Sequence, residues 1–140
     1  MALRSALRPV DDPLSHRWQR IEWTPWVSLH EAASTYRGIP RKQGIYRIRT
    51  RRGTGLLYIG ISVRLAGRLQ GLERAIHRPD HKGHYAGRCV SRARGVEISW
   101  IVLEELDKRQ LMGREVDLVA AYRRVMKASP RCQFAGQRIS

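Results

Sequence analysis

The chain has 140 residues, the size of one ordinary domain, and 42% of them are hydrophobic, which excludes disorder along the whole chain. Its formal net charge is +15, and such an excess favours a polyanionic partner, nucleic acid above all. No apolar run is long enough for a signal peptide or a membrane-spanning helix, so we expect a cytoplasmic protein without a membrane partner.

Residues 1–40 differ in composition from the rest and hold three of the four tryptophans, which are Trp18, Trp23 and Trp26. Ser28, with Glu31 three positions later, predicts the N-cap of a short helix. We interpret residues 1–40 as an N-terminal extension that packs on a domain formed by residues 41–140. The tryptophans could cover one side of a sheet, or they could contact DNA or a second copy of the chain.

Two strands joined by a turn are predicted next. In residues 44–50 the apolar Tyr46 and Ile48 alternate with Arg47 and Arg49, which is the period of a β-strand. The turn at 51–55 contains two glycines. The following segment, LLYIGI, is more uniformly apolar, as expected of a central strand.

The remaining elements alternate between helix and strand. Leucines at helical spacing predict an amphipathic helix over residues 63–78, followed by a loop rich in charge and histidine. Residues 95–106 read as a third strand, and residues 106–129 as a second long helix that ends before Pro130. The order β-β-α-β-α predicts an α+β fold, with a small antiparallel sheet flanked by helices.

The two cysteines, Cys89 and Cys132, show neither zinc-ligand spacing nor a CxxC pair. We therefore expect two free thiols in a reducing cytosol.

Two charged residues interrupt the apolar faces of the predicted helices. Glu115 lies within the apolar stripe of the last helix, so its carboxylate needs either a structural ion pair or a metal ion. Arg68 lies at the border of the stripe of the first helix. Either the aliphatic part of its side chain packs on the protein surface, or its guanidinium points into a cleft that binds phosphate.

A single cleft could hold Arg68 and Glu115 together with the phenols of Tyr46 and Tyr58. This set suits phosphodiester hydrolysis, because a carboxylate can hold Mg²⁺ and an arginine can stabilise a pentacovalent phosphate. A tyrosine can orient or deprotonate the attacking water.

These residues resemble the motifs of the GIY-YIG nuclease family. The two tripeptides of the family name are present at the usual separation, and Ser62 and Leu65 precede Arg68 as in the family run. Glu115 occupies the place of the family's metal-binding glutamate. The resemblance implies a three-stranded antiparallel sheet and catalysis that depends on one Mg²⁺ or Mn²⁺ held by Glu115. It also implies catalytic roles for Tyr46, Tyr58, Arg68 and Glu115.

Two positions depart from the family pattern. Gln133 stands where many members place an asparagine shortly after a proline, and we include it among the catalytic residues. Some members carry a histidine base one turn after the arginine, where this chain has Leu72. His84, from the loop after the first helix, is the candidate for that base.

Arginines gather on or beside the predicted hairpin and before the third strand, and we expect them to contact the phosphates of double-stranded DNA. The candidates are Arg47, Arg49, Arg51, Arg52, Arg64 and Arg88. We expect an endonuclease of restriction or mobile-element type, which would most simply cut both strands as a two-fold dimer. The alternatives are a non-catalytic basic module that binds nucleic acid and a structural basic protein of a large assembly.

Overall fold

The computed structural model describes residues 7–35, 38–78, 84 and 86–134. It contains a four-stranded antiparallel sheet with the order β1-β4-β2-β3. The three predicted strands are confirmed as β2 (Gly44–Thr50), β3 (Leu56–Ser62) and β4 (Val96–Val102). The prediction of three strands is wrong by one, because β1 (Val27–Ser28) pairs with the outer side of β4. A strand of two residues has no periodicity that a sequence could reveal.

Four helices surround the sheet in the described segments, and both long ones were predicted. They are α2 (Leu29–Ser34), α3 (Leu65–His77), α4 (Gly87–Val90) and α5 (Lys108–Met126), with a 3₁₀ turn η1 (Trp18–Arg20) before them. Helix α2 begins as predicted, because the Ser28 hydroxyl accepts a hydrogen bond from the Glu31 amide. The predicted order β-β-α-β-α therefore lacks η1, β1 and α4, which are too short to be recognised by pattern. None of the helices in the described segments is long and apolar enough to cross a membrane.

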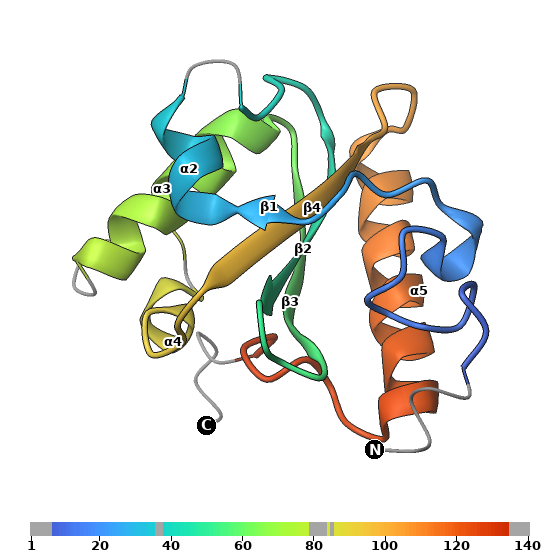
Figure 1. The fold of residues 1–140 in the computed structure, drawn as a ribbon. Coiled ribbons are helices and arrows are strands. Elements are labelled where there is room, and N and C mark those ends of the chain that lie inside the picture. The colour runs from blue at the N-terminus through green and yellow to red at the C-terminus, as the bar shows by residue number, and fades with distance from the viewer. Residues whose placement is uncertain (1–6, 36–37, 79–83, 85, 135–140) are drawn as a thin grey trace, which may run out of the picture.

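The sheet separates two apolar layers, as Figure 1 shows. Helices α2, α3 and α4 lie on one side, where Tyr46 and Ile48 of β2 pack against leucines of α3. Helix α5 lies on the other side, and the N-terminal tryptophans join it in a second cluster with Ile45 and Ile59. The predicted alternation of β2 is thus confirmed, and it directs each side chain to one layer.

Strand β3 lies at the edge of the described sheet, so the prediction of a central strand is wrong. Its apolar run has other causes, since both faces of β3 are covered. A register shift also places the neighbours Leu57 and Tyr58 in the same apolar cluster. The outer edge of β3 is covered by the C-terminal turn, where the Cys132 amide donates to the carbonyl of Leu57 at 2.7 Å. Covering an edge in this way prevents pairing with another chain.

The prediction of two free thiols is also wrong, because Cys89 and Cys132 form a disulfide bond. The bond joins α4 to the C-terminal turn across a sequence separation of 43 residues. Spacing along the chain could not reveal this pair, because the fold alone brings the two segments together.

The N-terminal segment covers one face of the sheet with its tryptophans. Trp18 is 0% exposed and Trp23 is 4% exposed, so neither offers a surface to DNA or to a second chain. The indole nitrogen of Trp23 donates to the carbonyl of Trp18 at 3.1 Å. The division of the chain at residue 40 stays a prediction.

Candidate active site

The two motif tyrosines lie side by side because a glycine faces them. Tyr46 on β2 is paired with Gly60 on β3, and the rings of Tyr46 and Tyr58 have centroids 6.0 Å apart. A Cβ at Gly60 would lie 2.5 Å from the Tyr46 hydroxyl and 2.6 Å from a ring carbon of Tyr58. Any larger residue at Gly60 would therefore displace one of the phenols.

Arg68 connects the two phenols to helix α3. Its guanidinium is half-buried, and both Tyr46 and Tyr58 favour its charged form. Burial lowers the pKa of Arg68, but the two phenols together outweigh burial, and the net pKa is raised. Its Nε has no hydrogen-bond partner within the described part of the chain. Arg68 is thus a permanently charged group with remaining donor capacity beside both tyrosines.

His84 lies in the same cluster, although no regular element carries it. Its Nε2 is 2.6 Å from the Tyr46 hydroxyl, and its Nδ1 accepts a hydrogen bond from the Ala86 amide at 3.0 Å. Burial, and then the charge of Arg68, lower the pKa of His84 to about 3, so the ring is neutral at pH 7. Because Nδ1 is an acceptor, the single ring proton is on Nε2 and is donated to Tyr46.

Sequence reasoning named His84 as a candidate for the cleft, beside the alternative of a solvated loop histidine, and it missed the Ala86 amide that sets the tautomer. A backbone amide carries no signal in the sequence, since every residue except proline has one. The tautomer also leaves His84 without an open acceptor nitrogen. The structure therefore argues against His84 as the general base and favours a role in holding Tyr46.

Glu115 lies on α5 and is half-buried. Burial raises the pKa of its carboxyl group, and the positive charge of Arg68 partly opposes this rise. Among the described residues no cation lies within 4.0 Å of the Glu115 carboxylate, so the ion-pair interpretation lacks a partner there. A half-buried carboxylate with open oxygens fits a hard divalent cation, which prefers one or two carboxylates plus water and phosphate oxygens.

Gln133 binds the backbone of β3. Its side-chain amide donates to the Ile59 carbonyl at 2.7 Å, and its Oε1 accepts from the Ile59 amide at 2.8 Å. Ile59 is the middle residue of the second motif, between Tyr58 and Gly60. The Gln133 side chain thus extends the hydrogen bonding of β3, and these two bonds are those of a positioning residue.

The structure corrects the prediction that Arg47 contacts DNA. Its side chain is 0% exposed and lies between two tryptophan rings, with its guanidinium carbon 4.4 Å from the centroids of both Trp23 and Trp26. One of its terminal nitrogens donates to the Pro13 carbonyl. Burial, and then the nearby charge of Arg49, lower the pKa of Arg47 to about 9. A buried guanidinium in this position cannot reach a phosphate.

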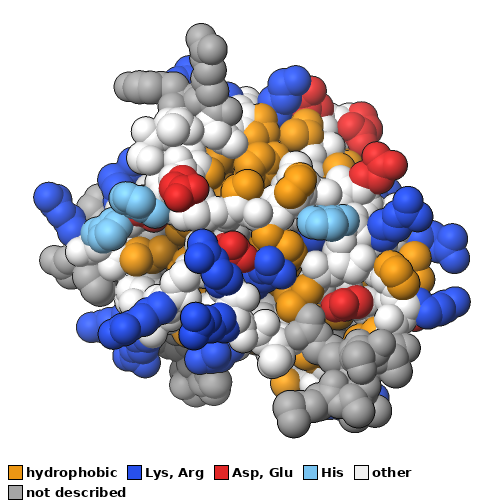
Figure 2. Space-filling view, viewed as in Figure 1, with side chains coloured by type: hydrophobic (Ala, Val, Ile, Leu, Met, Phe, Trp, Pro, Cys, Tyr) orange, Lys and Arg blue, Asp and Glu red, His pale blue; other side chains and the backbone are white. Residues whose placement is uncertain are grey.

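The other predicted DNA-binding arginines differ in how accessible they are. Arg49 forms a 2.9 Å ion pair with Glu97 and stacks on Trp26, whereas the Arg51 side chain is 71% exposed and 3.6 Å from Glu97. Exposed side chains are found at Arg52, Arg64 and Arg88. Figure 2 shows Lys and Arg side chains gathered on the lower left of one face, around α4.

Among solved structures, the chain is similar to the GIY-YIG N-terminal endonuclease domain of UvrC from Thermotoga maritima. A tyrosine-to-phenylalanine mutant of that domain is 21% identical, with a TM-score of 0.48, over 75% of this chain and 93% of that chain. The magnesium-bound domain is also 21% identical, with a TM-score of 0.47, over 75% and 94%. No protein-family model matches the chain, and no curated protein matches it in sequence.

Proposed function

We propose that the protein is a metal-dependent DNA endonuclease that hydrolyses phosphodiester bonds. One observation carries the proposal: the two motif tyrosines lie side by side with His84 at the Tyr46 hydroxyl, and the charge of Arg68 acts on both phenols and on the half-buried Glu115. A structural ion pair would neutralise that arginine with the carboxylate directly. Here the phenols act on the guanidinium instead, and the carboxylate oxygens remain available.

Tyr46 is the group that activates the attacking water. Its hydroxyl accepts a hydrogen bond from the Nε2 proton of His84, and the charge of Arg68 acts on it. This arrangement would let Tyr46 orient the attacking water or take a proton from it. His84, whose tautomer is set by the Ala86 amide, would hold the Tyr46 side chain in place.

Arg68 and Tyr58 bind the phosphate that is cut. The guanidinium presents planar donors that match phosphate oxygens, and it stabilises the charge that develops on them during hydrolysis. The Tyr58 hydroxyl would orient either the phosphate or the nucleophile.

Glu115 is the residue that would hold Mg²⁺ or Mn²⁺. When bound, a divalent cation would neutralise charge on the leaving oxygen. The position of Glu115 on α5 fixes the carboxylate. The positive charge of Arg68 favours the ionised form of the carboxyl group, against the opposing effect of burial on its pKa.

The exposed arginines would bind the duplex. Arg51, Arg52, Arg64 and Arg88 can contact phosphates, and affinity that depends on such contacts falls steeply with salt. These contacts would position DNA without reading its sequence. We extend the proposal to a restriction or mobile-element enzyme that cuts both strands as a two-fold dimer, formed by surfaces other than Trp18 and Trp23.

A cytoplasmic location also stays a prediction, and the disulfide does not favour it, since such bonds are rare in a reducing compartment.

Incubation of the protein with supercoiled plasmid, with Mg²⁺ or with EDTA, tests the proposal. We expect nicked or linear product only with Mg²⁺, and none with Glu115→Gln at equal protein concentration. A folded protein that shifts plasmid on a gel but never cuts it would instead be a non-catalytic binding module. Cutting by Glu115→Gln at the wild-type rate would refute the metal assignment.

A further inference from the structure

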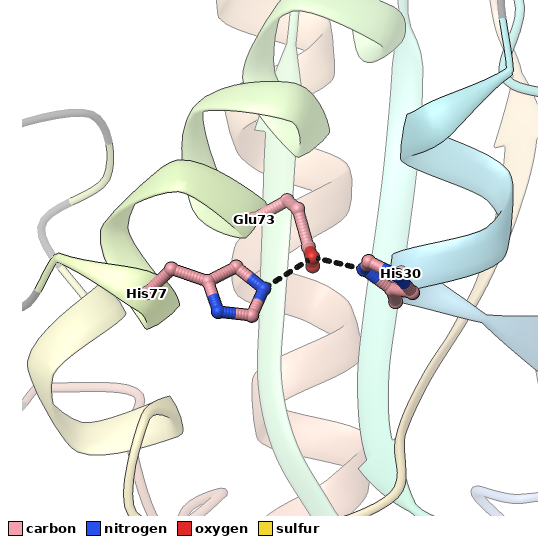
Figure 3. Close-up of side chains that lie close together, drawn as sticks. All are labelled: His30, Glu73 and His77. Carbon is pink, nitrogen blue, oxygen red and sulfur yellow. Dashed lines mark hydrogen bonds and ion pairs between the residues drawn. The ribbon is translucent and has the colours of Figure 1, made fainter.

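A second group of metal-ligating side chains lies between α2 and α3, away from the tyrosines. It consists of His30 on α2 with Glu73 and His77 on α3, and Figure 3 shows the carboxylate between the two rings. One Glu73 oxygen is 2.7 Å from the His30 Nδ1 and 2.8 Å from the His77 Nε2. The ligand atoms of all three residues lie within 4.8 Å of one another.

The fold rather than the sequence assembles this cluster. Glu73 and His77 are four residues apart, so they share one face of α3. His30 is 43 residues before Glu73 and reaches it only because α2 packs against α3. The cluster therefore joins the N-terminal segment to the helix that carries Arg68.

The donor set is that of a transition-metal site. Two imidazole nitrogens and one carboxylate oxygen are the protein ligands of known His₂Glu zinc sites, with water in the fourth position. Zinc–nitrogen bonds of about 2.1 Å require tetrahedral ligand atoms roughly 3.4 Å apart. Both Glu73–histidine distances are already shorter than this, and the exposed rings, at 72% and 64% for His30 and His77, can rotate to adjust.

The local charge also favours a cation. Glu73 is only 16% exposed, so its carboxylate is fixed between the rings rather than fully hydrated. The two cysteines do not compete for the ion, because they are bonded to each other.

We propose that His30, Glu73 and His77 form a binding site for Zn²⁺ or a similar late first-row transition metal. Imidazole ligands favour zinc, nickel, copper and cobalt, whereas Mg²⁺ favours oxygen ligands such as the Glu115 carboxylate. The bound ion clamps α2 onto α3. The site is independent of the proposed nuclease activity, since it shares no residue with the tyrosine cluster.

The test measures Zn²⁺ binding by calorimetry, with protein freed of any histidine tag and treated with a chelator. We expect one Zn²⁺ per chain, bound in the presence of millimolar Mg²⁺. His30→Ala and His77→Ala should each weaken this binding at least tenfold. His16→Ala is the matched control, because His16 is an exposed histidine outside the cluster, and this variant should bind as the wild type does. Glu115→Gln should also keep its Zn²⁺, which separates the two sites.

Thermal unfolding supplies a second measurement that does not depend on activity. Zn²⁺ at a hundredfold excess over its dissociation constant should raise Tm by about 8 °C. The rise should disappear in the double variant His30→Ala/His77→Ala, whose Tm should be the same with and without Zn²⁺. Wild-type protein that binds no Zn²⁺ would overturn the proposal. So would a double variant that binds Zn²⁺ as tightly as the wild type.

Discussion

Tyr46 and Arg47 are neighbours on β2, and both side chains are 0% exposed, yet they face opposite layers of the molecule. Tyr46 accepts a hydrogen bond from His84, and the charge of Arg68 acts on its hydroxyl. Arg47 lies between two tryptophans. The contrast teaches that burial of a polar group does not itself indicate function. What matters is whether its partners leave a reactive atom available.

The largest effect should follow removal of the arginine on the tyrosine side. Arg68→Ala should lower the cleavage rate by about 10³-fold, which is about 4 kcal/mol in the barrier, because charge developing on the phosphate loses its donor. Single-turnover cleavage of a labelled duplex measures this, and circular dichroism checks the fold. Arg74→Ala, at an exposed position of the same helix, is the control. If Arg68→Ala cuts at the rate of this control, the cluster has no catalytic role.

Acid should destabilise the tyrosine side through His84. The unfolded chain protonates this ring near pH 6.5, whereas the folded protein protonates it only near pH 3, because its pKa is lowered to about 3. Between these values the unfolded state binds more protons, so stability present above pH 6.5 is lost as the pH falls. Between pH 7 and pH 4 the loss should be about 3 kcal/mol.

Urea unfolding of wild type and His84→Asn at both pH values measures this contribution. The asparagine variant should be less stable at pH 7 but should lose less stability on acidification than the wild type does. The carboxylates common to both proteins cancel in this comparison. Equal losses in the two proteins would mean that His84 is not buried in its neutral form.

Substitution of Arg47 should have the opposite effect, because it should lower stability without directly changing DNA binding. Arg47→Ala should lower the free energy of unfolding by about 2 kcal/mol, because the space between the two indoles loses its packing. The loss is moderate, since the substitution also removes a buried charge with a lowered pKa. Its affinity for DNA, measured well below its unfolding temperature, should match that of the wild type. A tenfold loss of affinity would show that Arg47 reaches the duplex after all.

The smallest effect is expected at the exposed arginines. Arg52→Ala should leave the unfolding free energy unchanged and weaken duplex binding about threefold, which is less than 1 kcal/mol. The magnitude of the slope of log K against log salt should fall by about one, which corresponds to the loss of one phosphate contact. Fluorescence anisotropy at several salt concentrations measures both quantities. An unchanged slope would place Arg52 outside the DNA-binding surface.

Much of the site could be predicted because its residues lie on elements with clear periodicity. Tyr46 and Tyr58 are on predicted strands, and Arg68 and Glu115 stand out against apolar helical stripes. Gln133 was found by its motif position, but its bonds to Ile59 depend on the C-terminal turn meeting the edge of β3. His84 was found only as one candidate in a loop, and its tautomer depends on the Ala86 amide.

The sequence by itself determined the three longer strands, the two long helices and the face to which each residue of β2 points, because those patterns repeat over a few residues. Only the tertiary structure decided the fourth strand, the Cys89–Cys132 bond and the burial of Arg47. It also decided the contact between His30 and Glu73. Each of these depends on contacts between segments far apart in the chain, and such contacts leave no local period in the sequence.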